Sequence, residues 1–198
     1  MGAVSSIGLD RHDARGRLKR AFDIVVALPM LVAVAPVMLA AMLAIRLTSP
    51  GPAIFSQLRV GRDGVAFRCR KLRTMAAGTP SLPTHEAPQA AVTPLGRLLR
   101  RSKLDEFPQL WNVLKGEMSL VGPRPCLPTQ AELIEHRRRY GVLSLRPGIT
   151  GLAQARGIDM SDPALCARTD ATYLRHRSVA LDLRILRATF FGGDVPVD

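Results

Sequence analysis

The chain has 198 residues, 47% of them apolar, which is enough for one folded domain with a core, so the chain need not be disordered. A net charge of +12 indicates a polyanionic partner: nucleic acid, anionic lipid head groups or a phosphorylated substrate. Aromatic residues make up only 5% of the chain and no nucleic-acid-binding motif is found, so a nucleic-acid partner is the weakest of the three.

The first predicted element is an apolar helix near the N-terminus. The 22 residues from Ile24 to Ile45 carry no charge, and a helix of that length crosses a hydrocarbon core of about 30 Å. Pro36 lies in its middle and Pro29 nearer its start, and a proline inside a helix removes a backbone hydrogen bond. We therefore expect a kink or a full break at Pro36, leaving arms too short to cross the bilayer.

Basic residues flank this apolar segment on both sides. They are Arg15, Arg17, Lys19 and Arg20 before it and Arg46, Arg59 and Arg62 after it. Since positive charge marks the cytoplasmic side, a re-entrant hairpin that leaves both ends in the cytoplasm fits better than a single crossing. A cleaved signal peptide has a shorter apolar stretch, and a buried core helix needs protein on every side.

The remaining sequence predicts a mixture of strands and helices. Residues 53–58 and 65–72 are strand-like, and Asp63-Gly64 between them is typical of a hairpin turn. From Ala76 to Ala91 the chain is rich in Pro, Thr and Ala without periodicity, which predicts a mobile loop. Helices are expected over residues 94–103, 105–115, 130–140 and 163–189, the last interrupted near Ser178.

These elements predict an α+β, mainly helical fold in three parts. A basic N-terminal segment (residues 1–20) precedes a re-entrant membrane hairpin (21–47), and a cytoplasmic, membrane-surface domain (48–198) follows it. The domain includes the mobile loop at 76–91 and a small β-hairpin. The three cysteines, Cys69, Cys126 and Cys166, lack the spacing of a zinc site or a disulfide framework, so we expect reduced, structural thiols.

Adjacent acids at Asp105-Glu106 are the first candidates for chemistry. Acids are favourable in the first turn of a helix, so helix capping alone would explain them. Arg124, between two prolines, and Arg146, before Pro147-Gly148, lie on stiff backbone and are suited to binding phosphate oxygens. Two carboxylates beside such cations can bind Mg²⁺, and an aspartate can attack phosphorus.

Four longer motifs, in this order, resemble those of the bacterial sugar transferases known as small monotopic phosphoglycosyl transferases. They are KRAFDIVVALPMLVAVAP, SPGPAIFSQLRVGRDGVAFRCRKLRTM, LGRLLRRSKLDEFPQLWNVLKGEMSLVGPRP and LRPGITGLAQ. The resemblance covers residues 18–189. It implies a location at the cytoplasmic face of the bacterial inner membrane.

The resemblance also implies a reaction and a set of site residues. In that family an Asp-Glu dyad is catalytic, so Asp105 would be the nucleophile and Glu106, beside it, would help to hold Mg²⁺. A sugar phosphate would pass from a UDP-sugar through Asp105 to undecaprenyl phosphate, with release of UMP, at the start of bacterial glycoconjugate synthesis. The residues that match the family's phosphate and nucleotide contacts are Lys71, Arg73, Arg124, Arg146 and Gln154.

Two departures from the family pattern stand out. Ala35-Pro36 replaces the Ser-Pro pair at which the family's re-entrant helix breaks, and residues 155–159 replace a run of Asn-Gly-Arg type. Two other classes are weighed against the transferase: a peripheral anchor on anionic membrane and a basic nucleic-acid-binding module. Neither requires paired acids framed by rigid arginines. The sequence indicates neither the sugar nor whether the chain forms a homodimer.

Overall fold

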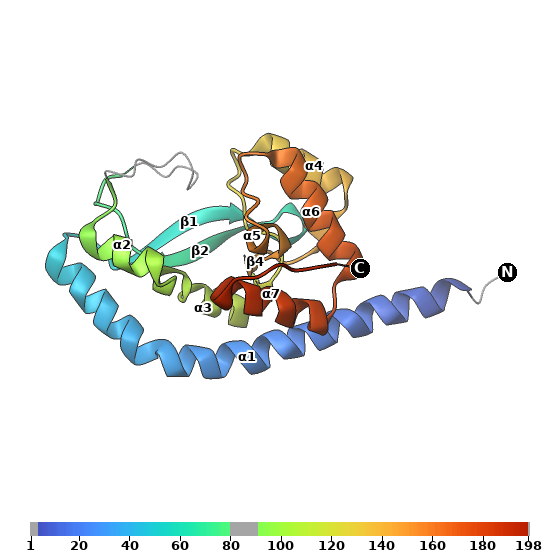
Figure 1. The fold of residues 1–198 in the computed structure, drawn as a ribbon, viewed down its shortest axis with the longest axis horizontal. Helices are drawn as coiled ribbons and strands as arrows, with labels where there is room; N and C mark the ends of the chain where they lie inside the picture. Colours follow the sequence, from blue (N-terminus) through green and yellow to red (C-terminus); the bar gives the residue numbers. More distant parts are fainter. Residues whose placement is uncertain (1–3, 80–90, 198) are drawn as a thin grey trace.

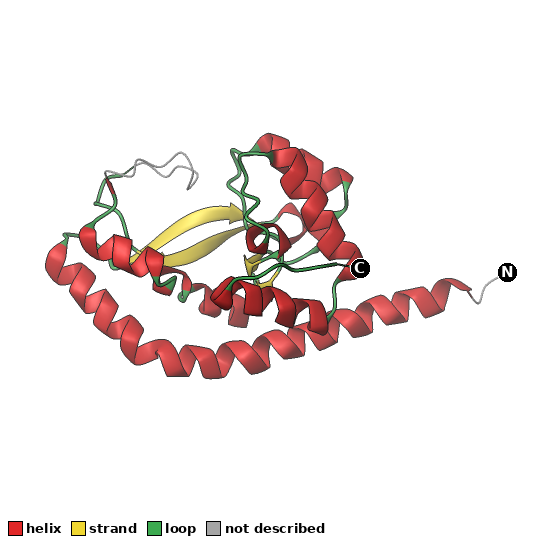
Figure 2. Cartoon of the chain, viewed as in Figure 1, coloured by secondary structure: helices red, strands yellow, loops and turns green. Residues whose placement is uncertain are grey.

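A long helix, α1 (Val4–Thr48), runs along one side of the molecule, and shorter helices with two small sheets lie against it (Figures 1 and 2). The computed structural model describes residues 4–79 and 91–197, with side chains from residue 16 onward. The prediction of a mainly helical α+β fold is confirmed. The basic segment expected at 1–20 is helical from Val4 and continuous with the apolar segment.

Most apolar side chains of α1 are exposed, although Ala27 and Ile45 are buried against the domain. Within Gly16–Thr48, the most apolar stretch of 18 residues has a mean hydropathy of 2.6, and only 6% of that stretch is buried against the rest of the chain. Val25 and Val32 are 70% and 67% exposed. Because a helix of this length and apolarity would not stay exposed to water, α1 indicates association with a membrane.

The helix α1 continues through both of its prolines. It bends along its apolar half but stays helical at Pro29 and Pro36 (Figure 1). A full break at Ala35-Pro36 is therefore not what the structure has, and the alternative expectation, a bend without a break, describes it. Each proline removes only its own backbone donor, while the turns on either side keep their hydrogen bonds.

Buried polar groups join α1 to the rest of the chain just before its apolar stretch. The carboxylate of Asp23, 1% exposed, accepts hydrogen bonds from Lys19 Nζ (2.8 Å), Ser119 Oγ (3.0 Å) and the Leu120 amide (3.1 Å). Lys19 also pairs with Asp182 at 2.9 Å, on another helix. These contacts fix which turn of α1 is attached to the domain.

The predicted β-hairpin is confirmed. Strand β1 (Ile54–Val60) pairs antiparallel with β2 (Ala66–Leu72), and Asp63 (φ 57°) and Gly64 (φ 79°) adopt the left-handed conformation in the turn between them. Most of the loop expected at 76–91 lies outside the described residues. Its two ends meet, since the Ala76 amide donates to the Ala91 carbonyl at 2.9 Å.

Six shorter helices follow α1 among the described residues: α2 (Pro94–Arg101), α3 (Gln109–Lys115), α4 (Ala131–Arg139), α5 (Leu152–Ala155), α6 (Pro163–His176) and α7 (Val179–Phe191). The helices predicted over 94–103, 130–140 and 163–189 are confirmed as α2, α4 and the pair α6 and α7. The expected interruption falls at Ser178, which caps α7. The helix predicted over 105–115 is wrong in its first turn: Leu104–Glu106 form a separate 3-10 turn, and α3 begins only after Pro108.

A second, parallel sheet was not predicted. Strand β3 (Ser119–Val121) pairs with β4 (Gly148–Thr150), with Ser119 opposite Gly148. The backbones are so close that a Cβ on Gly148 would lie 2.1 Å from the Gly122 amide nitrogen, so only glycine fits. The pair brings together the two Gly-Pro-Arg and Arg-Pro-Gly segments that the sequence marked as rigid.

Removing the carboxylate of Asp23 should weaken the attachment of α1. Asp23→Ala leaves the buried Leu120 amide without its acceptor and Lys19 with Asp182 alone, so we expect the free energy of unfolding to fall by roughly 2 to 5 kcal/mol. Chemical denaturation of the detergent-solubilised protein measures this. Glu132→Ala, at an exposed position of α4, is the control; an equal loss in both variants would contradict the role given to Asp23.

Candidate active site

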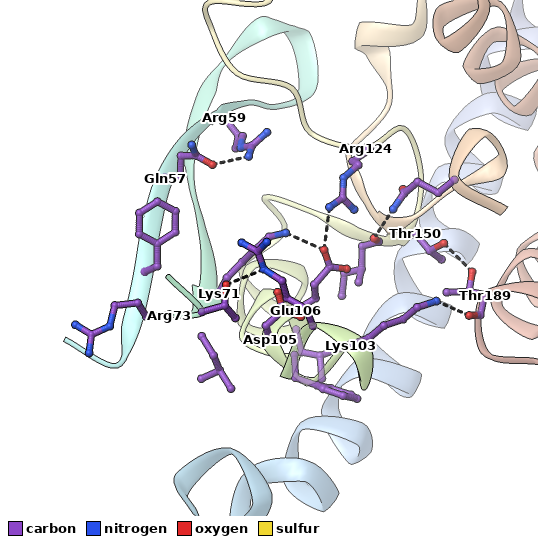
Figure 3. Close-up of a pocket in the computed structure, with 18 of the residues that line it drawn as sticks. Gln57, Arg59, Lys71, Arg73, Lys103, Asp105, Glu106, Arg124, Thr150 and Thr189 are labelled. Carbon is purple, nitrogen blue, oxygen red and sulfur yellow. Dashed lines mark hydrogen bonds and ion pairs between the residues drawn. The ribbon is translucent and has the colours of Figure 1, made fainter. Parts of the chain in front are cut away.

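A cavity of about 850 Å³ lies between the β-hairpin, the 3-10 turn and α7 (Figure 3). Its lining is basic and polar at one end and apolar where α1 and α7 contribute. The polar and charged side chains include Gln57, Arg59, Lys71, Arg73, Arg100, Lys103, Asp105, Glu106, Arg124 and Gln154. Six of the seven catalytic and phosphate-binding candidates proposed from the sequence therefore meet at one place.

One face of the β-hairpin supplies much of the basic lining. Successive side chains of a strand alternate between faces, and Phe55 lies opposite Lys71 in the register, so residues of odd number share a face in both strands. Gln57 and Arg59 therefore lie beside Lys71, where Figure 3 shows them. Arg59 is buried and donates to the Pro125 carbonyl at 3.0 Å and to Gln57.

The acidic pair is carried by the 3-10 turn. Lys103, immediately before it, has a left-handed backbone (φ 57°), which is uncommon for a residue with a side chain and is typical of constrained sites. Its ammonium donates to the Thr189 carbonyl at 2.5 Å, tying the turn to the end of α7. The tight turn presents Asp105 and Glu106 to the cavity side by side (Figure 3).

Glu106 is held by two cations from different parts of the chain. Its Oε1 accepts from Lys71 Nζ at 2.8 Å and from Arg124 Nη2 at 3.0 Å. Burial alone would raise the pKa of Glu106, but the charges and hydrogen bonds of Arg124 and Lys71 outweigh burial and lower that pKa to about 2. Glu106 is therefore ionised throughout the physiological range.

Asp105 has the opposite electrostatic setting. It is 8% exposed, and among the described residues no donor forms a hydrogen bond with its carboxylate. Burial raises the pKa of Asp105 above its usual range, although the charge of Lys71 works against the rise. The adjacent carboxylates thus differ in role: Glu106 is fixed by cations, and Asp105 keeps its oxygens available.

Arg73 and Gln154, two further candidates from the sequence, both line the cavity, but their side chains differ in hydrogen bonding. Arg73 lines the cavity, but its guanidinium donates to the carbonyls of Ser49 (2.8 Å) and Pro50 (2.6 Å) at the end of α1. Gln154 also lines it, with Oε1 buried and lacking a partner among the described residues. A side-chain oxygen left without a donor is open to a substrate group.

Arg146 is not brought to this cavity. Its Nε donates to the Gly116 carbonyl at 2.8 Å, beyond the end of α3. The backbones of the two proline-rich segments meet at the second sheet, where the Gly148 amide donates to the Pro123 carbonyl at 2.9 Å. Only the side chain of Arg124 reaches Glu106, whereas that of Arg146 is engaged at Gly116.

Sequence reasoning missed several cavity residues. Gln57 and Arg59 share the face of Lys71, and the period-two pattern of the predicted hairpin could have identified them. Arg100, whose Nε donates to Thr74 Oγ1 at 2.9 Å, could have been inferred only from the tertiary packing of α2. The basic lining is therefore larger than predicted.

The carboxylate pair fits Mg²⁺ bound together with a diphosphate. Residues 4–79 and 91–197 hold no group of three or more His, Cys, Asp or Glu side chains that could bind a metal by themselves. Asp105 has free carboxylate oxygens, and only Oε1 of Glu106 is engaged by cations. Mg²⁺ characteristically takes one or two carboxylates and completes its shell with water and substrate phosphates.

The chain belongs to the bacterial sugar transferase family, which matches residues 14–193. It is 40% identical over 185 residues to a UDP-glucose:undecaprenyl-phosphate glucose-1-phosphate transferase of Caulobacter vibrioides, covering 86% of this chain and 67% of that protein. An Escherichia coli protein of the same name is 39% identical over 193 residues, covering 90% of this chain and 40% of its own length.

A third relative matches this chain in length. The exopolysaccharide production protein PSS of Rhizobium leguminosarum bv. phaseoli is 38% identical over 188 residues, covering 87% of this chain and 92% of that protein. The chain thus spans about two thirds of the Caulobacter protein and less than half of the Escherichia coli protein. The family predicted from the four sequence motifs is confirmed.

The two cations on Glu106 should make the protein sensitive to acid. Because the folded-state pKa of Glu106 is lowered from 4.5 to about 2, its ionised form stabilises the fold above about pH 4.5, and this stabilisation is lost as the pH falls toward 2. Between about pH 5 and pH 2 we expect wild type to lose about 2 kcal/mol more unfolding free energy than Glu106→Gln.

Chemical denaturation at a series of pH values measures this difference. Glu132→Gln makes the same chemical change at an exposed site and should keep the wild-type pH dependence. If Glu106→Gln also kept it, Lys71 and Arg124 would not lower the pKa of Glu106.

Proposed function

We propose that the protein transfers a sugar phosphate from a UDP-sugar to undecaprenyl phosphate and releases UMP. The observation that carries the proposal is a buried aspartate, without hydrogen-bond donors among the described residues, next to a glutamate that Lys71 and Arg124 hold ionised. The names of the Caulobacter and Escherichia coli relatives support the donor and acceptor classes. The product would begin bacterial exopolysaccharide or other glycoconjugate synthesis.

The proposed reaction has two displacements at one phosphorus atom. A carboxylate oxygen of Asp105 attacks the phosphorus that carries the sugar; the bond to the second phosphate breaks, and UMP leaves with the electron pair. An oxygen of the lipid phosphate then attacks the same phosphorus. The bond to Asp105 breaks, its carboxylate is regenerated, and a polyprenyl diphosphate sugar results.

The basic side chains would stabilise the charge that develops on the phosphates. Lys71 and Arg124 lie on the same side of Glu106, and guanidinium and ammonium groups neutralise phosphoryl oxygens in the transition state (Figure 3). Arg59 and Arg100 extend this basic lining. Asp105 and Glu106 would hold Mg²⁺, which when bound neutralises the diphosphate and aids departure of UMP.

The apolar end of the cavity fits the acceptor lipid. Val26 and Met30 of α1 and Leu186 and Phe190 of α7 line it, and α1 is the helix whose apolar side chains are exposed. An acceptor in the bilayer could therefore bring its phosphate to Asp105 while its prenyl chain stays in apolar surroundings.

We further propose that α1 enters and leaves the membrane by the cytoplasmic face. Its bend and the basic residues on both flanks support a re-entrant course, because positive charge favours the cytoplasmic side and anionic head groups. The long bent helix, rather than a broken one, would then form the hairpin.

Asp105→Asn should abolish transfer while leaving the fold intact. The amide keeps the shape of the side chain but is a far poorer nucleophile, so we expect turnover to fall by about four powers of ten or more. UMP release from a panel of UDP-sugars, with undecaprenyl phosphate and Mg²⁺, measures it, and mass spectrometry of trapped wild type should show one added phosphosugar.

Asp63→Asn, in the exposed hairpin turn, is the matched control and should keep wild-type turnover. Wild-type turnover in Asp105→Asn would refute the mechanism. Absence of UMP release from every UDP-sugar, with folded wild-type protein, would favour the membrane-anchor function instead.

The re-entrant course predicts that both flanks of α1 face the cytoplasm. The native cysteines are buried, so single cysteines at Gly16→Cys and Val65→Cys report on the two flanks. In intact spheroplasts neither should react with a membrane-impermeant maleimide, and both should react after lysis. Labelling of Gly16→Cys alone before lysis would show a single crossing.

A further inference from the structure

The backbone around Arg124 is held by an unbroken series of hydrogen bonds. Four successive carbonyls each accept a hydrogen bond, and the donors come from three parts of the chain: β4, α4 and the end of β1. The pairs are Gly148 N to Pro123 O (2.9 Å), Arg137 Nη1 to Arg124 O (2.8 Å), Arg59 Nη1 to Pro125 O (3.0 Å) and Val60 N to Cys126 O (2.9 Å). Since the prolines on either side of Arg124 also fix their own φ angles, this segment has little freedom to move.

Arg137 is the most deeply buried of the arginines that contact this segment. It lies on α4, is 3% exposed, and donates to Asp170 Oδ2 on α6 through Nε (2.9 Å) and Nη2 (2.7 Å). Its remaining nitrogen, Nη1, is the one that reaches the Arg124 carbonyl. One planar guanidinium thus joins the carboxylate of Asp170 to the backbone of Arg124.

Neither member of this ion pair lines the cavity. Burying two charges is costly, and an apolar pair of similar volume commonly stabilises a fold as well or better. Attachment of α4 to α6 therefore does not by itself account for the pair. Its contact with the Arg124 carbonyl gives it a second effect, on a residue that reaches the cavity.

We propose that Arg137 and Asp170 are positioning residues that act through Arg124. The pair fixes the backbone of Arg124 so that its guanidinium meets Glu106, 3.0 Å away, and faces the diphosphate. This assignment rests on the proposed transfer reaction for its effect on rate. Asp170 orients Arg137, Arg137 donates to the Arg124 carbonyl, and the guanidinium of Arg124 places its positive charge beside the diphosphate.

Lysine could not replace Arg137 in this arrangement. The guanidinium fork donates in two directions at once, whereas an ammonium is a single point of charge. Arg137→Lys would keep the ion pair with Asp170 while losing the bond to Arg124. The variant therefore separates the positioning role from simple charge neutralisation.

The test is a double-mutant cycle on kcat/KM for the UDP-sugar. Arg137→Met with Asp170→Leu removes the pair without leaving a buried charge, and Arg137→Lys is the second, more conservative variant. We expect either to lower kcat/KM about 10- to 100-fold, as small misplacements of catalytic groups do. In an Arg124→Met background the same changes should have almost no further effect.

A matched control lies on the same helix. Arg138→Met with Glu135→Leu removes an exposed ion pair by the same types of change and should leave kcat/KM at the wild-type value. Equal losses in the presence and absence of the Arg124 side chain would overturn the proposal, because the pair would then act on the fold in general. Unchanged kcat/KM in both Arg137 variants would overturn it as well.

A measurement on Arg124 itself is independent of turnover. In ¹⁵N-arginine-labelled protein, a guanidinium held in an ion pair rotates slowly about its Cζ–Nε bond, and we expect this rotation to quicken for Arg124 in either Arg137 variant. Unchanged rotation would overturn the proposal. If wild type released no UMP, the proposed function would fail while this measurement still decided the positioning role.

Discussion

The shared ion pair at Glu106 Oε1 is the interaction on which the site depends. It joins three segments distant in the chain: β2 through Lys71, the 3-10 turn through Glu106, and the proline-flanked segment through Arg124. With both cations engaged by one oxygen, the site keeps a net positive lining beside Asp105. Lys71 and Arg124 repel each other unless the Glu106 carboxylate lies between them. The positions of these two cations therefore depend on Glu106 staying ionised.

The rest of the fold supplies the surroundings that this interaction needs. The β-hairpin presents alternate side chains to the cavity, and the tight backbone approach at Gly122 and Gly148 fixes where the Arg124 segment leaves β3. The buried groups around Asp23 hold α1 beneath both. Buried polar contacts of this kind restrict movement, which suits a site that must align several charges.

Local patterns predicted much of this structure. The Asp-Gly turn, the helix that begins at Pro94, the interruption near Ser178 and the apolar length of α1 depend on neighbouring residues and can be recognised in a short window. The Asp105-Glu106 pair was also recognised, through its neighbours and through family resemblance. The 3-10 turn that carries the pair was not predicted, because α3 begins one turn later than expected, after Pro108.

Features that depend on distant contacts could not be predicted in this way. Strands β3 and β4 have three residues each, too few for a periodic pattern, and they are far apart in the chain. The Arg146 side chain is held outside the cavity by a carbonyl thirty residues away in the chain, and the role proposed for Arg137 depends on a carbonyl thirteen residues away. In both cases a contact between a guanidinium and a distant backbone carbonyl, which no local pattern predicts, decides where the arginine side chain lies.

The junction between α1 and the domain has a consequence for how the protein would encounter its acceptor. From Asp23 to Met30 the helix rises only about 10 Å, so the polar junction and the apolar wall of the cavity lie within two turns of each other on α1. For an acceptor confined to the bilayer, encounter would then be a two-dimensional search, governed by molecules per unit area of membrane. The soluble donor of the proposed reaction would instead reach the site by diffusion in the cell's aqueous volume. The supply of nucleotide sugar would then control the first displacement, and the lipid composition of the membrane would control the second.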